Sequence, residues 1–365
     1  MFAEAGLGAL DDAGVAPDEV EALYYGNFMG EMADHQGHQG PMMAEAIGAD
    51  GVGATRYESA CASAGAAVRQ GVRDVRNGEA DLVVVGGAER MTNIGTAGAT
   101  EALSIAADDL YEVNQGITFP GAYALMARAY FDQLGGSTED LAHIAVKNHD
   151  NAMENEHAQL HREISVEDHQ EAPQLASPLG LYDSCPITDG AAAIVLASED
   201  YAAENGLDET VAITGTGQGG DRLALQDRED VTETPAAANA ADEAYDDAGI
   251  GPDDVDFAEV HDCFTIAEVL AAEALGLFEK GEGISKAREG ITTRDGEMPI
   301  NVTGGLKAKG HPVGATGASQ VAQITMLLRG DHGRSDAVDD ASTAIAHNAG
   351  GTAASTTVHV LEVTE

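Results

Sequence analysis

The segment "ALDDAGVAPDEV", Ala9 to Val20, recurs as "AYDDAGIGPDDV", Ala244 to Val255, with eight of the twelve positions identical. Each copy is typical of the last turn of a helix, a glycine stop at Gly14 or Gly249, a Pro-Asp helical turn and then a strand. A repeat of this kind indicates that the chain is built from two related halves.

A second, weaker echo relates "CASAGAAV" from Cys61 to "GATGASQV" from Gly314, and each segment opens a predicted helix. A strand that ends in glycine follows in each half, "ADLVVVGGAE" at residues 80–89 and "ASTAIAHNAGG" at residues 341–351. Helices that alternate with nearly continuous apolar strands predict parallel sheets covered on both faces. The fold class is therefore α/β.

The repeat divides the chain into three segments. Residues 1–91, with a return strand "DGAAAIVLAS" inside residues 183–200, form the first half, and residues 201–365 form the second. Residues 92–182 form an insertion with helical stretches such as "PGAYALMARAYFDQLG". An insertion of this length on a symmetrical scaffold can cover a substrate or be a structural embellishment, and the sequence leaves both open.

The charge of the chain is strongly negative. With 63 Asp and Glu against 18 Lys and Arg, the net charge is −45 and is spread along the whole sequence. Such a surface repels nucleic acids and anionic membranes. The 44% apolar content argues against disorder, so we interpret the charge as adaptation of a halophile's protein to a very salty cytoplasm, where molar salt screens self-repulsion.

The three cysteines, Cys61, Cys185 and Cys263, lie far apart and do not resemble a disulfide framework. No paired Cys/His spacing indicates a zinc site, and no glycine-rich loop matches a dinucleotide or P-loop motif. The apolar runs are too short to cross a bilayer, and Met1 leads into an amphipathic helix rather than a signal peptide. We therefore expect a cytoplasmic, reduced protein without a metal.

Cys61 is the first candidate for chemistry. Its place at the start of a helix predicts a lowered thiol pKa, although a free cysteine is more often buried and inert. In the second half, "NVTGGLKAKGHPVGATG" holds His311 in a glycine-flanked loop at the equivalent position. If the halves pack about a pseudo-twofold axis, His311 faces Cys61 and can act as its base.

Two further motifs end strands of the second half. "HDCF", His261 to Phe264, offers a second thiol, Cys263, that can act as acid and base. "HNAGG", His347 to Gly351, has glycine N–H groups that could point at an oxyanion. Each motif is weak alone, but their ordered combination is specific.

Together with "PLGLYDSCPITDGAAAIVLAS", these motifs resemble the thiolases, and in particular the archaeal and sterol-carrier-protein-2-like branch. The resemblance covers almost the whole chain. It implies two duplicated βαβαβ-type halves that form a layered αβαβα core with an inserted loop domain. Family members usually begin with a strand, whereas Met1 here starts almost directly in a helix. Either the first sheet lacks a strand or the start codon lies upstream, and we favour the latter. The second half keeps its counterpart near "ETVAITGTG", Glu209 to Gly217.

The resemblance also implies roles for single residues. Cys61 corresponds to the nucleophile that takes the acyl group as a thioester, and His311 to the histidine that activates it and lines the first oxyanion hole. Gly350 corresponds to the glycine whose N–H forms a second oxyanion hole with that of Cys61. His261 takes the place of an asparagine that helps to hold a water of the first hole.

The resemblance leaves two candidates for the acid/base residue, because Asn348 stands where common thiolases carry that cysteine. We favour Cys263 as the replacement and keep His347 as the alternative. Cys185 is interpreted as structural. Among the scarce cations, Lys147, Lys309 and Arg128 are expected near the phosphates of coenzyme A.

The implied function is that of an acetyl-CoA C-acetyltransferase, which forms or cleaves acetoacetyl-CoA with coenzyme A thioesters as substrates and no cofactor. The alternative is a non-catalytic or partner-dependent subunit that scaffolds an acyl-CoA complex. The resemblance further suggests a homodimer or homotetramer, a small OB-fold and zinc-ribbon partner, and hydroxymethylglutaryl-CoA synthase. Chain-length preference, direction and pathway, whether mevalonate synthesis or fatty-acid breakdown, are not determined by these residues.

Overall fold

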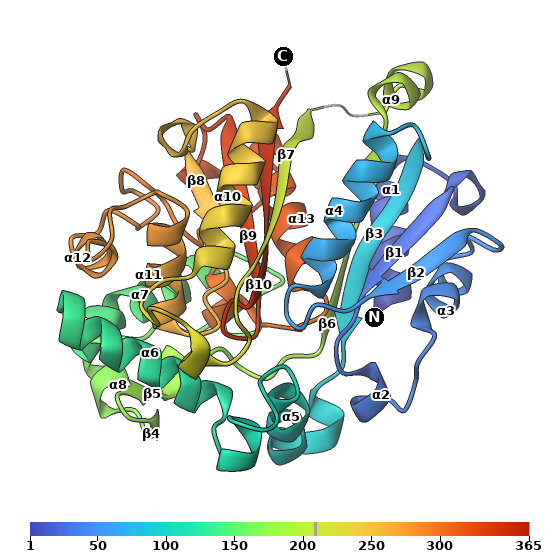
Figure 1. The fold of residues 1–365 in the computed structure, drawn as a ribbon. Coiled ribbons are helices and arrows are strands. Elements are labelled where there is room, and N and C mark those ends of the chain that lie inside the picture. Colours follow the sequence, from blue (N-terminus) through green and yellow to red (C-terminus); the bar gives the residue numbers. More distant parts are fainter. Residues whose placement is uncertain (208–209, 365) are drawn as a thin grey trace.

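In the computed structural model, which describes residues 1–207 and 210–364, two four-stranded sheets form the frame of the described part (Figure 1). The first sheet has the strand order β2 (Gly53–Tyr57), β1 (Ala22–Gly26), β3 (Leu82–Glu89) and β6 (Gly190–Ala197). The second has the order β7 (Val211–Gly220), β10 (Ser355–Val363), β9 (Thr343–Gly350) and β8 (Phe257–Glu259).

Both sheets are mixed, so the prediction of parallel sheets holds for the strands that the helices connect and fails where the return strands pair. β1 pairs in parallel with β2 and β3, and β8 does so with β9. In contrast, β6 runs antiparallel to β3, and β10 runs antiparallel to both β9 and β7. Only a short turn, residues 351–354, separates β9 from β10, and so short a connection can only join antiparallel neighbours.

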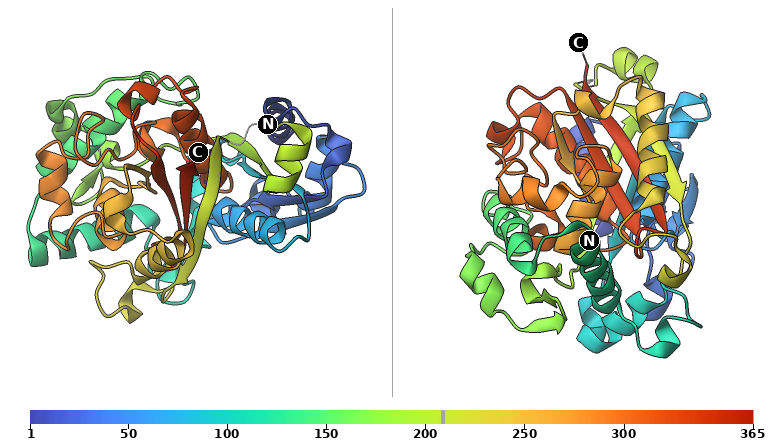
Figure 2. Two further views of the ribbon diagram at one scale, coloured as in Figure 1. Left: turned by 90° about the horizontal axis from the view of Figure 1, so that it is seen from above. Right: turned by 60° about the vertical axis from the view of Figure 1, so that its left-hand side comes forward.

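Helices cover and separate the two sheets. α1 (Phe2–Ala13) and α3 (Gln39–Ala46) pack on the first sheet, and α10 (Pro235–Ala248) and α11 (Thr265–Ala274) lie on the outer side of the second. α4 (Ser63–Arg76) and α13 (Thr316–Arg329) lie between the sheets and contact each other. Figure 2 shows from above the two halves side by side. This is the layered αβαβα core that the sequence predicted.

The repeated segment folds alike in both halves. α1 ends at Ala13 and α10 at Ala248, and the following Gly14 and Gly249 adopt left-handed φ angles of 71° and 75°. Each helix is followed by a 3₁₀ turn, Pro17–Glu19 or Pro252–Asp254, and then by β1 or β8. The predicted helix, glycine stop, turn and strand are therefore confirmed in both copies.

The halves differ at one sheet edge. β7 pairs with the return strand β10, whereas within residues 1–207 and 210–364 no strand pairs with the outer edge of the corresponding return strand, β6. This agrees with the predicted lack of a first strand. Glu209, which the sequence placed at the start of the β7 segment, lies outside the described residues.

The inserted region lies at the bottom and lower left of Figure 1 and packs mainly on the second half. It contains α5 (Gly95–Ser104), α6 (Phe119–Leu134), α7 (Thr138–Ala152), α8 (Val166–Glu171) and the hairpin of β4 (Gln174–Ala176) and β5 (Leu179–Gly180). Tyr123 and Met126 of α6 share an apolar core with Ile266 and Leu270 of α11. The predicted boundaries at residues 92 and 182 stay a prediction.

Shorter elements complete the described chain. They are α2 (Gly30–Ala33), α9 (Glu199–Asn205), α12 (Gly283–Arg288), the π-helical turn η7 (Gly305–Lys309) and the 3₁₀ turns η2 (Thr92–Ile94), η3 (Val113–Gln115), η4 (Leu181–Asp183), η5 (Leu225–Asp227) and η8 (Ser335–Ala337). None of the helices in the described residues has the length and apolar character needed to span a membrane.

A stripe of glycines lets α10 lie directly on β7. A Cβ atom at Gly215, Gly217 or Gly219 would come within 1.9 to 2.1 Å of a carbonyl oxygen of α10. On the facing side of α10 are alanines one turn apart, Ala236, Ala240 and Ala244, all fully buried. Small residues on both surfaces therefore set the distance between this helix and the sheet.

We expect Gly217→Ala to lower the free energy of unfolding by about 2–3 kcal/mol, because its methyl group would lie 1.9 Å from the Ala240 oxygen and force α10 outward. Gly220→Ala on the same strand is the control, since its nearest neighbour lies at 3.9 Å, and should change stability by about 0.5 kcal/mol or less. Urea denaturation measures both. Equal stabilities of the two variants would contradict the close packing.

Candidate active site

Cys61 lies in a tight turn that leads into α4. The preceding Ala60 has a φ angle of 50°, a conformation that residues other than glycine rarely adopt. The Ser63 hydroxyl donates to the Ala60 carbonyl (2.5 Å) and accepts the N–H of Ser59 (2.9 Å). These bonds hold the turn, which presents Cys61 half-buried at the end of the inner helix layer.

Cys61 is joined by two histidines of the second half. The sulfur of Cys61 and one ring nitrogen each of His261 and His311 all lie within 4.8 Å of one another. The two rings meet edge to face with a centroid distance of 4.8 Å. The repeat predicted that His311 faces Cys61, and the structure brings the two together.

The hydrogen bonds around His311 define its tautomer. The hydroxyl of Thr316 donates to the carbonyl oxygen of Pro312 (3.1 Å), so it accepts the Nδ1–H of His311 (2.7 Å). The other nitrogen, Nε2, then carries a lone pair and has no partner. Burial lowers the pKa of His311 to about 3, so this imidazole is neutral and Nε2 can accept a proton.

His261 has the opposite tautomer. The amide of Asn348 donates to Nδ1 of His261 (3.1 Å) and to the carbonyl oxygen of Cys61 (3.1 Å). The proton of His261 is therefore on Nε2, which is buried and has no partner. Burial and the neighbouring His311 hold the pKa of His261 well below its usual value. A neutral N–H with no partner is suited to an oxyanion.

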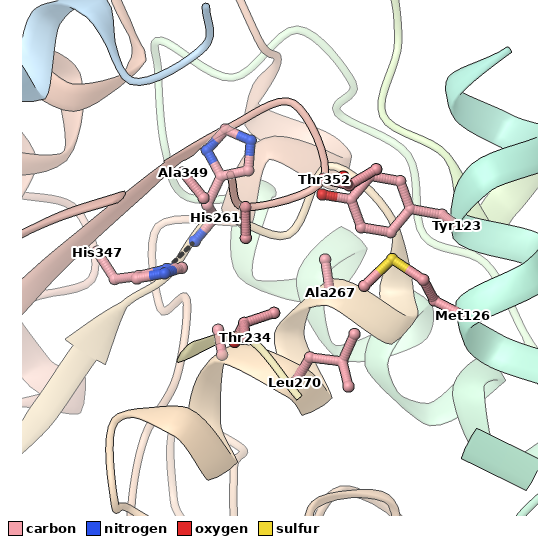
Figure 3. Close-up of a pocket in the computed structure, with 11 residues that line it drawn as sticks. Tyr123, Met126, Thr234, His261, Ala267, Leu270, His347, Ala349 and Thr352 are labelled. Atoms are coloured by element: carbon pink, nitrogen blue, oxygen red, sulfur yellow. Dashed lines mark hydrogen bonds between the residues drawn. The ribbon is translucent and has the colours of Figure 1, made fainter. Parts of the chain in front are cut away.

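The side chain of His347 lies on the face of the second sheet that is opposite to Cys61. On β9 it points with Ile345 toward α10 and α11, whereas its neighbour Asn348 points toward Cys61. Figure 3 shows His347 accepting the backbone N–H of His261 (3.3 Å) and lining a small apolar cavity with Leu270. The ring is thus not part of the group around Cys61.

Cys263 lies two residues beyond His261, in the apolar core shared by α6 and α11. Burial, with the nearby Cys185, raises the pKa of the Cys263 thiol well above its usual value, and a contact with the Tyr123 hydroxyl acts in the opposite direction. Tyr123 also donates to the carbonyl oxygen of Gly351 (3.0 Å). Tyr123, which sequence analysis did not single out, therefore connects Cys263 to the HNAGG turn.

The glycines of HNAGG touch the nucleophile turn. A Cβ atom at Gly350 would lie 2.4 Å from the Ser59 carbonyl oxygen, so only glycine allows this approach. The N–H of the next residue, Gly351, acts on the Cys61 thiol and lowers its pKa. Sequence analysis named Gly350, and the structure adds Gly351.

The electrostatics of Cys61 differ from the prediction. Burial raises the pKa of its thiol to about 12, and Glu89 and Glu58 act in the same direction, against the backbone N–H of Gly351, which lowers it. The expected lowering by the helix start was wrong because removal from water outweighs it. Both Cys61 and His311 are therefore neutral at rest. The Cys61 thiolate can then form only when a base such as Nε2 of His311 takes its proton.

Two expected phosphate ligands are engaged inside the protein. Lys147 pairs with Glu268 (2.5 Å) and Lys309 with Glu259 (3.4 Å), and all four side chains are buried. The expectation that these lysines meet coenzyme A phosphates does not fit this burial, since a buried carboxylate needs a cation. The guanidinium of Arg128 is exposed near Ser177 and stays available.

Two buried carboxylates hold the loops of the site, and sequence analysis missed both roles. Asp262 of HDCF accepts the N–H of Leu306 (2.6 Å) and the amide of Asn148 (2.7 Å), which ties this motif to the turn before His311. Burial and the neighbouring Glu268 raise the pKa of Asp262 to about 7.

Glu89, at the end of β3, has four donors. It accepts the N–H groups of Phe28 (2.8 Å), Met29 (3.1 Å) and Gly314 (3.1 Å) and the amide of Asn27 (2.8 Å). Through Gly314 it fixes the His311 loop to the first half. Burial raises the pKa of Glu89 to about 7, although its backbone donors act in the opposite direction.

Comparison with protein families accounts for nearly the whole chain. The thiolase N-terminal domain matches residues 1–200, and the thiolase C-terminal domain-like family matches residues 217–363. The chain belongs to the thiolase family.

Relatives of this thiolase agree with the predicted branch. It is 42% identical to the acetyl-CoA acetyltransferase of Methanothermobacter thermautotrophicus, over 99% of this chain and 93% of that protein. It is 30% identical to sterol carrier protein 2 of Oryctolagus cuniculus, over 96% of this chain and 65% of that protein. A chain of the solved Ltp2-ChsH2(DUF35) aldolase superposes with a TM-score of 0.82 at 25% identity, covering 99% of this chain and 91% of that one.

Thr316→Val should lower kcat for thiolysis at least about tenfold with little change in KM, because the Nδ1–H of His311 loses its acceptor and the imidazole its fixed tautomer. Thr325→Val is the control, since Thr325 lies on the same helix and bonds only to its own backbone turn (2.9 Å). Steady-state kinetics on both variants provide the measurement. Wild-type kcat in Thr316→Val would contradict the orienting role.

Glu89→Gln should remove a pH dependence of stability. The pKa of Glu89 is raised in the folded protein from 4.5 to about 7, so its contribution to stability is largest below pH 4.5 and is lost as the pH rises to 7. The stability of the wild type relative to Glu89→Gln should therefore fall across this window and stay level above it. Urea denaturation at several pH values tests this, with the exposed Glu101→Gln as control. Parallel pH curves for wild type and Glu89→Gln would refute it.

Proposed function

We propose that this thiolase joins two molecules of acetyl-CoA into acetoacetyl-CoA and free coenzyme A, and catalyses the reverse thiolysis. The observation that carries the proposal is that the Cys61 sulfur lies within 4.8 Å of a ring nitrogen of His311, whose Nε2 is buried without a hydrogen-bond partner. The acetyl substrate follows the name of the relative from Methanothermobacter thermautotrophicus. No metal or redox cofactor is needed for this chemistry.

The first half-reaction transfers an acetyl group to the enzyme. Nε2 of His311 takes the proton of Cys61 as the sulfur attacks the thioester carbonyl of acetyl-CoA. The tetrahedral intermediate collapses, the bond to the coenzyme A sulfur breaks, and that sulfur receives the proton from His311. The result is an acetyl thioester on Cys61 and free coenzyme A.

The second half-reaction forms the carbon–carbon bond. A second acetyl-CoA loses a methyl proton to the thiolate form of Cys263, our preferred base, and the enolate oxygen is stabilised by Nε2–H of His261. The enolate carbon attacks the acetyl group on Cys61, whose oxygen faces the N–H groups of Cys61, Gly350 and Gly351. Collapse of this intermediate releases acetoacetyl-CoA and returns the thiolate of Cys61, which takes up the proton held by Cys263 and so restores the base. The position of His347 on the far side of β9 supports Cys263 over it.

A partner-dependent form of this activity is the second candidate. The similar Ltp2-ChsH2(DUF35) aldolase carries DUF35 in its name, and this supports a DUF35-type partner for the present chain. Such a partner could correspond to the OB-fold and zinc-ribbon protein implied by the resemblance, alongside hydroxymethylglutaryl-CoA synthase in a mevalonate pathway. A salty archaeal cytoplasm and a dimeric or tetrameric state complete this proposal.

The experiment combines thiolysis of acetoacetyl-CoA in molar KCl with mass spectrometry of Cys61 after incubation with labelled acetyl-CoA. We expect turnover and a labelled Cys61 peptide in the wild type, and neither in Cys61→Ser. Cys263→Ser should still be acetylated but should lose at least about 100-fold in exchange of the acetyl-CoA methyl protons with solvent. His347→Gln, a matched buried substitution, should keep this exchange.

Different failures lead to different conclusions. Acetylation of Cys61 without turnover, restored by a DUF35-type protein, would favour the partner-dependent form. No acetylation and no turnover with or without that partner would rule out the enzyme. If Cys263→Ser keeps normal exchange of the acetyl-CoA methyl protons and His347→Gln loses it, the acid/base residue is His347 and not Cys263.

A further inference from the structure

The group around Cys61 contains donors that the proposed reaction does not need at the same time. Cys61, His261 and His311 each offer one ligand atom, and these atoms lie within 4.8 Å of one another. His261 and His311 are only 1% and 5% exposed, and Nε2 of each has no hydrogen-bond partner. Buried polar atoms without partners are costly and indicate that something else binds there.

The donor set has a clear chemical preference. One thiolate sulfur and two imidazole nitrogens suit Zn²⁺, which binds sulfur at about 2.3 Å and nitrogen at about 2.0 Å. Rotations of the three side chains that shift their ligand atoms by about 1 Å would bring these atoms into a tetrahedral arrangement around one cation. Three protein ligands leave the fourth position open for water.

We propose that Cys61, His261 and His311 bind one thiophilic divalent cation, Zn²⁺, and that this binding inhibits the enzyme reversibly. The cation displaces the thiol proton and forms a bond to the Cys61 sulfur, with no change in oxidation state. The sulfur lone pair is then held by the metal, so Cys61 cannot attack a thioester. The inhibition rests on the proposed nucleophile role of Cys61, whereas the binding does not.

Asn348 allows His261 to become a ligand. Its amide now donates to Nδ1 of His261, which leaves the proton on Nε2. The amide oxygen, Oδ1, is buried without a partner. A half-turn of this amide would break its bond to the Cys61 carbonyl oxygen but would let Oδ1 accept an Nδ1–H, and the lone pair of Nε2 would then face the metal.

The acidic surface does not compete for the same cation. Carboxylates suit hard cations such as Mg²⁺, so excess Mg²⁺ in molar KCl occupies the surface carboxylates. Within residues 1–207 and 210–364, no other three His, Cys, Asp or Glu side chains have ligand atoms as close as these. Zinc binding under such conditions therefore reports on the group around Cys61.

Protection from alkylation tests the site in the wild-type protein without substrate. Iodoacetamide labelling of Cys61 and of the similarly half-buried Cys185 is followed by peptide mass spectrometry with and without micromolar Zn²⁺. We expect Zn²⁺ to slow labelling of Cys61 at least about tenfold, reversibly with EDTA, and to leave Cys185 unchanged. Equal protection of both cysteines, or of neither, would overturn the proposal.

Two histidine variants identify the ligands. His261→Asn should weaken the protection at least about tenfold, whereas His347→Asn removes a buried imidazole on the other face of β9 and should not. Equal effects of the two would overturn the assigned ligands, and the wild-type comparison stands even if His261→Asn does not fold. Zinc binding in a protein without thiolysis would refute the proposed function alone, while thiolysis insensitive to Zn²⁺ would refute this site alone.

Discussion

The close approach of α4 and α13 is the contact on which the rest of the site depends. A Cβ atom at Gly317 would lie 2.3 Å from the backbone nitrogen of Gly65, and one at Gly65 would lie 2.1 Å from the Thr357 hydroxyl. Both glycines stand in the first turn of their helices, so the two helices meet backbone to backbone at their starts. The turns that precede these helices carry Cys61 and His311, and the same contact therefore brings a thiol of one half to an imidazole of the other.

Around this meeting point the protein maintains neutral groups in a buried environment. Burial raises the pKa of Cys61 and lowers those of His311 and His261, so no charge is held at rest where the reaction takes place. Charge is instead confined to the supporting network, where Lys147 and Lys309 are each paired with a carboxylate. A neutral pair that transfers one proton during attack avoids the cost of a permanently buried thiolate.

How much could be predicted depended on how far each interaction reaches along the chain. The helix, glycine stop and strand of each repeat are local patterns, and their order was predicted correctly in both copies. The facing of Cys61 and His311 was predicted because a repeated chain implies an axis. The roles of Glu89 and Thr316 were not, because a carboxylate at a strand end or a threonine in a helix shows nothing of its partners in a linear sequence. Lys147 and Lys309 were placed wrongly for the same reason.

The sequence by itself determined the two related halves, the order of helices and strands, and the small set of residues able to do acyl transfer. Local propensities and a repeat are enough for this, because they depend on neighbours a few positions apart. Only the tertiary structure decided which ring nitrogens are free, that His347 lies behind β9 while Asn348 contacts Cys61, and that burial outweighs the helix start at the Cys61 thiol. Most of these outcomes depend on groups far apart in the chain, such as Asn348 and Cys61, which are 287 residues apart, and on the amount of water that their packing excludes.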